Sequence, residues 1–287
     1  MRDLDADTIS DYVAKEFDLP HTPRPSQLLT LLVKSAHDYI RESGLTHSEL
    51  RSLLQFFRRV GETTSAKRDE FTLLSDVMGV SSLVDILADT RNPGVTTASP
   101  LGPYYLPNSP VVEQGGALCR QNEPGLPTIL LGRVTDTEGA AIEGALLDIW
   151  HNAESGLYSN EDAAQDDMNN RGKIYTDLQG QFQIKTIRPR PYTIPMDGPV
   201  GDLMSAFGRS PWRSAHFHVI VSAKGYDSVI SELFFSDCQY IDKDAVAAVR
   251  RSLIHEPMYR KTERGNTLIV EHHFCLQRTA ERDGAVL

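Results

Sequence analysis

Cysteine and long apolar runs are scarce in this chain, and each scarcity excludes a class of protein. The 287 residues include only 3 Cys. The cysteines are odd in number, lie far apart (Cys119, Cys238 and Cys275) and form no CxxC pattern, so they predict reduced thiols in a cytoplasmic protein. No apolar run approaches the ~20 residues that span a bilayer. The acidic opening residues are also unlike a signal peptide, so we expect no membrane segment and no export.

Positive charge is also in deficit. The chain has 29 Lys and Arg against 39 Asp and Glu, a formal net charge of −10. A protein of this sign does not attract nucleic acid or an anionic membrane as its main partner. The remaining composition, 40% hydrophobic and 24% charged, is that of an ordinary globular protein long enough to bury a large core.

The first third of the chain has helical periodicity. One predicted helix opens at Pro25 and ends at Gly44, and Thr46 and Glu49 then form a capping-box pattern that starts a second helix, ending at Gly61. Two more helices are predicted over 71–78 and 82–89. Short amphipathic helices need a packing partner, so residues 1–95 are predicted to form a helical domain that acts as a cap or as a dimer interface.

From about residue 96 the periodicity falls to two, and glycine and proline become frequent. The expected fold is mainly β with a helical amino-terminal region: an antiparallel β-sandwich catalytic domain over 96–287, with a last helix over 244–254. The predicted strands are 129–136, 145–150, 181–187, 213–221, 233–235 and 268–275.

The strand over 213–221 carries the first candidate site. His216 and His218 are two residues apart, so both imidazoles point to the same face of the strand. Buried polar groups are costly without partners, and one metal ion would satisfy both. Such His-x-His pairs also occur in sheets without metal. Tyr158, just after a strand, and Tyr192, in a loop stiffened by three prolines, would each be a packing residue if taken alone.

Six motifs occur together in a fixed order, and the chain resembles the intradiol ring-cleavage dioxygenases in them. The motifs are Leu101-Gly-Pro-Tyr-Tyr-Leu-Pro, Asp148-Ile-Trp-His-Asn-Ala, Gly156-Leu-Tyr158, Pro191-Tyr192-x-Ile-Pro, Asp197-Gly-Pro and Pro211-Trp-Arg213-x-Ala-His216-x-His218. The resemblance implies one ferric ion per subunit, held by Tyr158, Tyr192, His216 and His218. It gives two catalytic residues, Tyr192 as a ligand that leaves and accepts a substrate proton, and Arg213 as the cation beside the reacting carbon. The helical third points to the catechol and hydroxyquinol branch.

The same resemblance implies a substrate pocket and partners. The predicted wall residues are Leu73, Asp76, Pro100, Leu101, Gly102, Pro103, Tyr104, Ile194, Pro195, Arg213 and Val246. Asp76 would accept a hydrogen bond from a third ring hydroxyl, which favours cleavage of hydroxyquinol (1,2,4-trihydroxybenzene) to maleylacetate over cleavage of catechol to cis,cis-muconate. The expected partners are an aromatic diol or triol, O2 and a second copy bound through the helical domain, with a lipid possible at that interface.

Alternatives and departures remain at this point. Zinc is a weaker metal hypothesis because tyrosine pairs are unusual zinc ligands. The facial triad of ferrous oxygenases needs a carboxylate with two histidines, and no His-x-Asp/Glu occurs here. A non-catalytic transthyretin-like sandwich is the alternative outside enzymes. Two residues depart from the family pattern: Pro100 replaces a β-branched residue, and Glu232 stands where catechol enzymes tend to have glutamine. Three further histidines, His151, His272 and His273, are left out of the predicted ligand set.

Overall fold

The structure is a computed structural model that describes residues 4–19, 22–119, 123–262 and 265–279. Contacts between residues divide the chain into two units, one ending at Phe57 and one running from Arg58 to Thr279. Residues 58–95 belong to the same contact unit as the sheets. The domain boundary near residue 95 stays a prediction.

The first unit is helical. It contains α1 (Ile9–Glu16), α2 (Pro23–Ser43) and most of α3 (His47–Thr63). Helix α2 opens on a proline, which lacks the N–H that would have no partner there, and stops at Gly44 in a left-handed conformation with φ 63°. The capping box before α3 is confirmed: the Thr46 N–H donates to Glu49 Oε2 at 2.8 Å and the Glu49 N–H to Thr46 Oγ1 at 3.3 Å.

Two predicted helices and one unpredicted helix lie in the second unit. Helix α4 (Glu70–Val77) is capped by the Asp69 side chain, and α5 (Val80–Arg91) follows after the left-handed Gly79. The third, α6 (Pro199–Ala206), was not predicted from the sequence. Among the described helices, none is alone long and apolar enough to cross a bilayer; α4 and α5 pass that test only as a pair, and the pair is bent by 68°.

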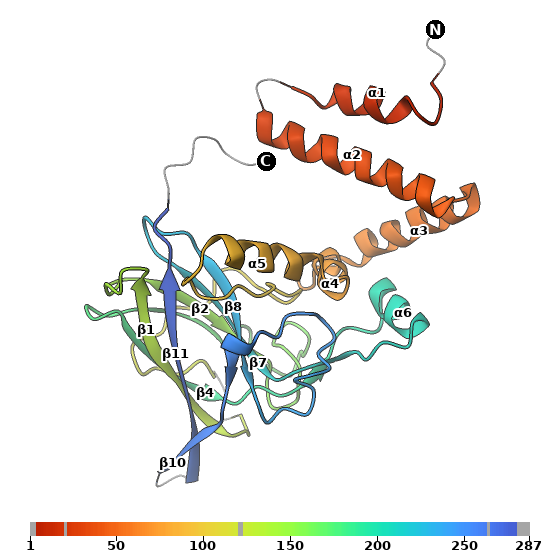
Figure 1. The fold of residues 1–287 in the computed structure, drawn as a ribbon. Helices are drawn as coiled ribbons and strands as arrows, with labels where there is room; N and C mark the ends of the chain where they lie inside the picture. Colours follow the sequence, from red (N-terminus) through yellow and green to blue (C-terminus); the bar gives the residue numbers. More distant parts are fainter. Residues whose placement is uncertain (1–3, 20–21, 120–122, 263–264, 280–287) are drawn as a thin grey trace. The chain divides into compact units, whose positions relative to one another are not determined.

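Two sheets and a short ribbon make up the rest of the second unit (Figure 1). One sheet has the order β10-β11-β1-β4, the other β3-β2-β7-β8-β9, and β5 pairs with β6 in the ribbon. Most pairs are antiparallel, as predicted, while β1–β11 and β8–β9 are parallel. The strands are β1 (Pro127–Asp136), β2 (Leu146–Trp150), β3 (Arg171–Tyr175), β4 (Gln181–Ile187), β5 (Tyr192–Thr193), β6 (Trp212–Arg213), β7 (His216–Ser222), β8 (Val229–Phe235), β9 (Ile254–His255), β10 (Met258–Thr262) and β11 (Gly265–Leu276).

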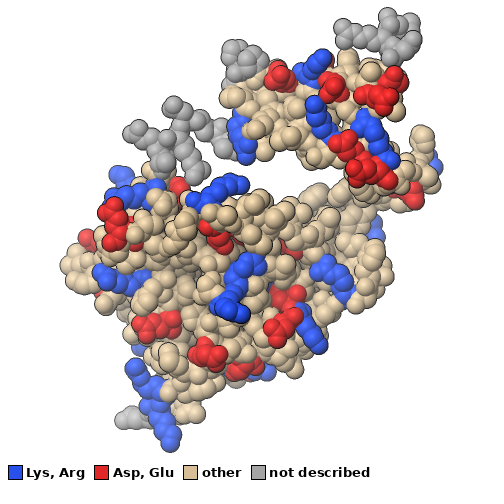
Figure 2. Space-filling model, in the orientation of Figure 1, with Lys and Arg blue, Asp and Glu red and all other residues tan. Residues whose placement is uncertain are grey.

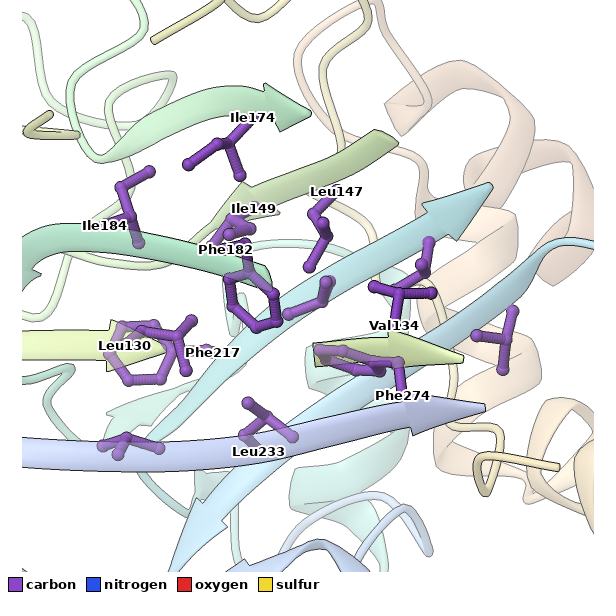
Figure 3. Packing of buried hydrophobic residues seen from close by; sticks show 14 of the residues in the cluster. Leu130, Val134, Leu147, Ile149, Ile174, Phe182, Ile184, Phe217, Leu233 and Phe274 are labelled. Carbon is purple, nitrogen blue, oxygen red and sulfur yellow. The ribbon is translucent and has the colours of Figure 1, made fainter. Parts of the chain in front are cut away.

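The inner faces of the two sheets share one hydrophobic core. Phe182 of β4, Phe217 of β7 and Phe274 of β11 are nearly fully buried and belong to a single cluster, and Figure 3 shows these side chains in the space between the strands. Because side chains alternate along a strand, Phe217 in this core places His216 and His218 on the opposite face of the five-stranded sheet. The candidate site therefore lies outside the sandwich core.

Two local predictions were wrong. Residues 244–250 form turns, with a 3-10 helix at Arg251–Leu253, where one long helix was expected. The Asp244 carboxylate accepts from the Val246 N–H at 3.1 Å, and such a local bond competes with helix formation. Arg213 also lies in the separate strand β6, because residues 214 and 215 interrupt the predicted strand before His216.

Candidate metal centre

Two neutral imidazoles meet on the outer face of β7. The Nε2 atoms of His216 and His218 are 3.0 Å apart. His216 Nδ1 donates to the Ser214 carbonyl at 2.6 Å, which leaves the Nε2 lone pair of a neutral ring free. Burial, with Arg213 nearby, lowers the pKa of His216 to about 3, and burial also lowers the pKa of His218. Both rings can therefore act as neutral metal ligands.

Two tyrosine hydroxyls lie beside the imidazoles. The hydroxyl oxygens of Tyr158 and Tyr192 are 3.5 Å apart, and the Tyr192 and His216 ring centroids are separated by 5.7 Å. Both side chains are buried, and burial raises the pKa of each phenol. A buried phenol of this kind ionises only next to a strong positive charge, which a metal ion supplies.

Packing fixes the ligand rings in place. Trp150 of β2 lies opposite His218 in the sheet register, and the two rings stack with centroids 4.7 Å apart. Tyr158 packs on Tyr104, and the Glu161 carboxylate accepts both the Tyr104 hydroxyl and the Tyr158 backbone N–H. Glu161 lies outside the six motifs, although it follows Tyr158 by only three residues.

A second unpredicted residue, Arg171, lies against the Tyr158 ring. The buried Arg171 guanidinium lies 5.6 Å from the centre of the Tyr158 ring and donates to Ser159 and Asn160. Burial lowers the pKa of Arg171 to about 10, so the side chain is still a cation at neutral pH. A cation over the ring stabilises electron density on the phenolate form of this tyrosine.

The ribbon β5–β6 brings Arg213 to the site. Tyr192 and Arg213 are paired directly across this ribbon. Arg213 Nε donates to the Asp244 carboxylate at 3.0 and 3.2 Å, and Nη2 donates to Glu232 Oε1 at 2.9 Å. Burial alone would lower the pKa of Arg213, but the two carboxylates hold it well above its usual value. The guanidinium is therefore a fixed buried cation.

The predicted wall residues from the loop 100–104 approach the histidines. Gly102 has φ 75°, and a Cβ atom there would lie 3.2 Å from His218 Cε1 and 3.4 Å from His218 Nε2. A side chain at this position would be strained and would press on the imidazole. The Pro103 carbonyl accepts the Asp69 N–H at 3.1 Å, which ties the loop to the start of α4. Pro100 is buried, and Leu101 is partly buried against Tyr158 and its neighbours.

Asp76 of α4 is buried and lies within electrostatic range of Arg213 and Glu232. Its Oδ1 atom has no hydrogen-bond partner among the described residues. Burial raises the pKa of Asp76 to about 7, although a hydrogen bond from Ser81 acts against this. The other expected wall residues are also buried or partly buried: Leu73, Ile194, Pro195 and Val246.

The Glu232 carboxylate lies beside the two histidines. It lies opposite His218 in the register of β7 and β8, is fully buried, and has Oε1 3.2 Å from His216 Nε2. Its ligand atom and those of the two histidines lie within 4.8 Å of one another. A carboxylate therefore lies beside the two histidines from the neighbouring strand β8, although no His-x-Asp/Glu pattern occurs in the sequence.

The histidines left out of the ligand set lie elsewhere. His151 is buried with both ring nitrogens engaged, Nδ1 with the Asn152 carbonyl and Nε2 with Thr186 Oγ1, each at 2.6 Å. His272 of β11 contacts His255 at a centroid distance of 5.1 Å, and His273 is exposed. None of these three is in the group of His216, His218 and Glu232.

Comparisons with known proteins agree with this geometry. Residues 101–278 match the family model Dioxygenase, and residues 22–96 match Catechol dioxygenase N terminus. The chain is 34% identical to a 6-chlorohydroxyquinol 1,2-dioxygenase of Cupriavidus pinatubonensis, over 93% of this chain and 95% of that protein. It is 36% identical to a catechol 1,2-dioxygenase of Candida albicans, over 81% and 78% of the two chains. A solved hydroxyquinol 1,2-dioxygenase of Pseudomonas putida matches with TM-score 0.81 and 34% identity, over 96% and 99%.

The chain therefore belongs to the intradiol ring-cleavage dioxygenases, which are enzymes, and the alternative of a non-catalytic transthyretin-like module does not hold. The donor atoms fit a metal ion: neutral imidazole nitrogens and phenol oxygens converge, and one nitrogen of the buried His218, Nδ1, has no hydrogen-bond partner among the described residues. Phenolate oxygen and imidazole suit a hard or borderline cation, with no thiolate among the donors.

Proposed function

We propose that this protein opens the ring of hydroxyquinol between its two adjacent hydroxyl-bearing carbons with O2, giving maleylacetate, at one ferric ion per subunit. The observation that carries the substrate assignment is Asp76, a buried carboxyl within electrostatic range of Arg213, with one oxygen that has no hydrogen-bond partner in the described part of the chain. A third ring hydroxyl would donate to this oxygen. Catechol, which yields cis,cis-muconate, is the second candidate, favoured by the apolar Leu73 on the same helix as Asp76.

Tyr158, Tyr192, His216 and His218 would hold the ion. When bound, ferric iron supplies Lewis acidity and draws electron density from a catecholate, which makes the ring reactive toward O2. Tyr192 lies in the two-residue strand β5, opposite Arg213, where its oxygen can accept a proton from a substrate hydroxyl. The Arg213 guanidinium stabilises negative charge that develops on the ring, because it is held rigidly in a buried position. The absence of a side chain at Gly102 leaves room for the His218 imidazole.

Oxygen uptake and colour together test this function. Protein reconstituted with ferric iron should absorb visible light through tyrosinate-to-iron charge transfer and should consume O2 fastest with hydroxyquinol, then catechol, then protocatechuate. A preparation that stays colourless after ferric reconstitution would contradict the iron site. A coloured protein that prefers catechol would retain the iron site and remove the role assigned to Asp76.

Asp76→Leu tests the hydroxyl-binding role directly. The change removes the acceptor and keeps the branched shape of the side chain, so we expect kcat/KM for hydroxyquinol to fall at least about tenfold relative to that for catechol. Asp85→Leu is the matched control, since Asp85 is also partly buried with a pKa raised to about 6 by burial. An equal fall for both substrates, or the same shift in the control, would contradict the assignment.

The same variant has a second readout in stability. Burial raises the pKa of Asp76 to about 7 in the folded protein, whereas its pKa in the unfolded chain is near 3.8. Burying the ionised carboxylate therefore costs stability, and this cost grows as pH rises from about 4 to 7. Wild-type protein should therefore lose stability between about pH 4 and 7 relative to Asp76→Leu, in urea unfolding of the metal-free proteins. Parallel curves would show that Asp76 is not desolvated.

We also propose a cytoplasmic homodimer. Helices α2 and α3 of the first unit leave large apolar side chains exposed, among them Leu31, Leu32, Tyr39 and Leu54. A second copy, with a lipid filling the interface, would cover these side chains. On the visible face of the molecule, acidic and basic side chains are interspersed (Figure 2), which supports a small-molecule substrate over a polyanionic partner.

A further inference from the structure

The sheet register places a carboxylate against the proposed metal ligands. Trp150, His218 and Glu232 occupy neighbouring positions on β2, β7 and β8, so all three side chains emerge from the same face of the five-stranded sheet. The Trp150 ring covers one side of His218, and Glu232 lies on the other side. Its position is therefore determined by backbone pairing, independently of any flexible loop.

Two hydrogen bonds fix the Glu232 carboxylate. Oε2 accepts from the Ser99 hydroxyl, and Oε1 accepts from Arg213 Nη2 at 2.9 Å. The same Oε1 atom lies 3.2 Å from His216 Nε2 and 3.6 Å from His218 Nδ1. One oxygen is thus anchored away from the imidazoles, while the other faces both of them.

Arg213 does not cancel the charge of Glu232. The guanidinium is shared with Asp244, which it contacts through Nε at 3.0 Å. Two carboxylates against one guanidinium leave one net negative charge in a buried place, where electrostatic interactions are weakly screened. Of these two carboxylates, Glu232 is the one whose oxygen lies within 4.8 Å of the ligand atoms of His216 and His218.

We propose that Glu232 is a further member of the metal shell, with its carboxylate facing the cation beside His216 and His218. This proposal rests on the proposed function only in assuming that the Tyr–His group holds a metal ion. A full negative charge at this place tightens the hold on a cation and favours the ferric over the ferrous state, since the higher charge gains more from an added anion. Glu232 is here a positioning residue for the ion, distinct from the groups that touch substrate.

Glu232→Gln tests the proposal because it removes the charge and keeps the shape. Ferric-reconstituted wild type and variant would be titrated with a competing chelator, and iron retention would be followed by the visible absorption band. We expect the variant to hold iron at least tenfold more weakly, with a shifted band and faster reduction by ascorbate. Asp136→Asn is the matched control: it removes a buried carboxylate charge that is paired with Arg278 and not with the site residues, and it should hold iron within threefold of wild type.

The outcomes separate cleanly. Equal iron affinity in Glu232→Gln and wild type overturns the proposal. So does an equal loss in Asp136→Asn, because the effect would then follow from removing any buried charge and not from the place of Glu232 beside the histidines. If Glu232→Gln fails to fold, as judged by circular dichroism, Glu232→Asp replaces it. The aspartate side chain is one methylene shorter and moves the charge away from the ion, so iron retention should weaken at least threefold. Unchanged retention in this variant overturns the proposal. Wild-type protein that binds no iron contradicts the proposed function instead.

Discussion

Replacing Tyr158 with phenylalanine is expected to abolish ring cleavage and to remove much of the visible absorption of the ferric protein. The substitution deletes one proposed ligand oxygen and keeps the ring that packs on Tyr104 at 4.9 Å. Loss of a residue that only supports a metal ligand weakens metal binding about 10–100-fold. Loss of a ligand itself should therefore lower the affinity for iron by at least about 100-fold. Iron content, absorption and O2 uptake would be measured on the same preparations.

Tyr105→Phe is the control for this experiment. The Tyr105 hydroxyl donates to Asp148 at 3.3 Å and its ring packs on Trp150, so it lies close to the centre without facing the ligand group. The control should keep its colour and most of its activity. A Tyr158→Phe protein that retains full colour and activity would show that another group takes the role of this tyrosine.

Replacing Arg213 with glutamine is expected to lower kcat by about 10²–10³, with a smaller change in KM. Removal of one preorganised group that stabilises developing charge has effects of this size, about 3–4 kcal/mol. The same change leaves Glu232 and Asp244 without their shared cation, so the free energy of unfolding should fall by about 3–5 kcal/mol as well. Steady-state kinetics and urea unfolding would be measured on each protein.

The kinetic readout distinguishes catalysis from a purely structural ion pair. Arg188→Gln is the matched control, because Arg188 pairs with Asp237 and lies over Phe235 without contacting the ligand group. It should lose some stability and keep kcat. If Arg213→Gln lost stability but kept kcat, Arg213 would be only a structural ion pair at the edge of the site.

The histidine pair and most strands could be predicted because their signals are local. A period of two fixes the face on which His216 and His218 lie, and the structure brings their Nε2 atoms to 3.0 Å. Helix ends were equally readable where a local cap exists, as at Gly44 and at Thr46 with Glu49. Tyr158 and Tyr192 required the motif resemblance, since nothing in their local sequence indicates a ligand.

Glu232 and the segment after Asp244 could not be predicted in the same way. The distance between Glu232 and His216 depends on the register of β8 against β7, and a slip of one residue would turn the carboxylate to the other face. Residues 244–254 have helical periodicity, but Asp244 uses its oxygens for Ser214, Val246 and Arg213. This tertiary role competes with the helix and is invisible in a local pattern.

The bonds of Asp244 have a consequence for redesign of the pocket. One carboxylate holds both the backbone of the predicted wall residue Val246 and the guanidinium of Arg213, so the position of each depends on Asp244. Enlarging the pocket at Val246 to admit bulkier rings would preserve the cation only if the new side chain left that backbone amide in place. Side-chain trimming at Val246 is thus a safer route to new substrates than insertion or deletion in this turn.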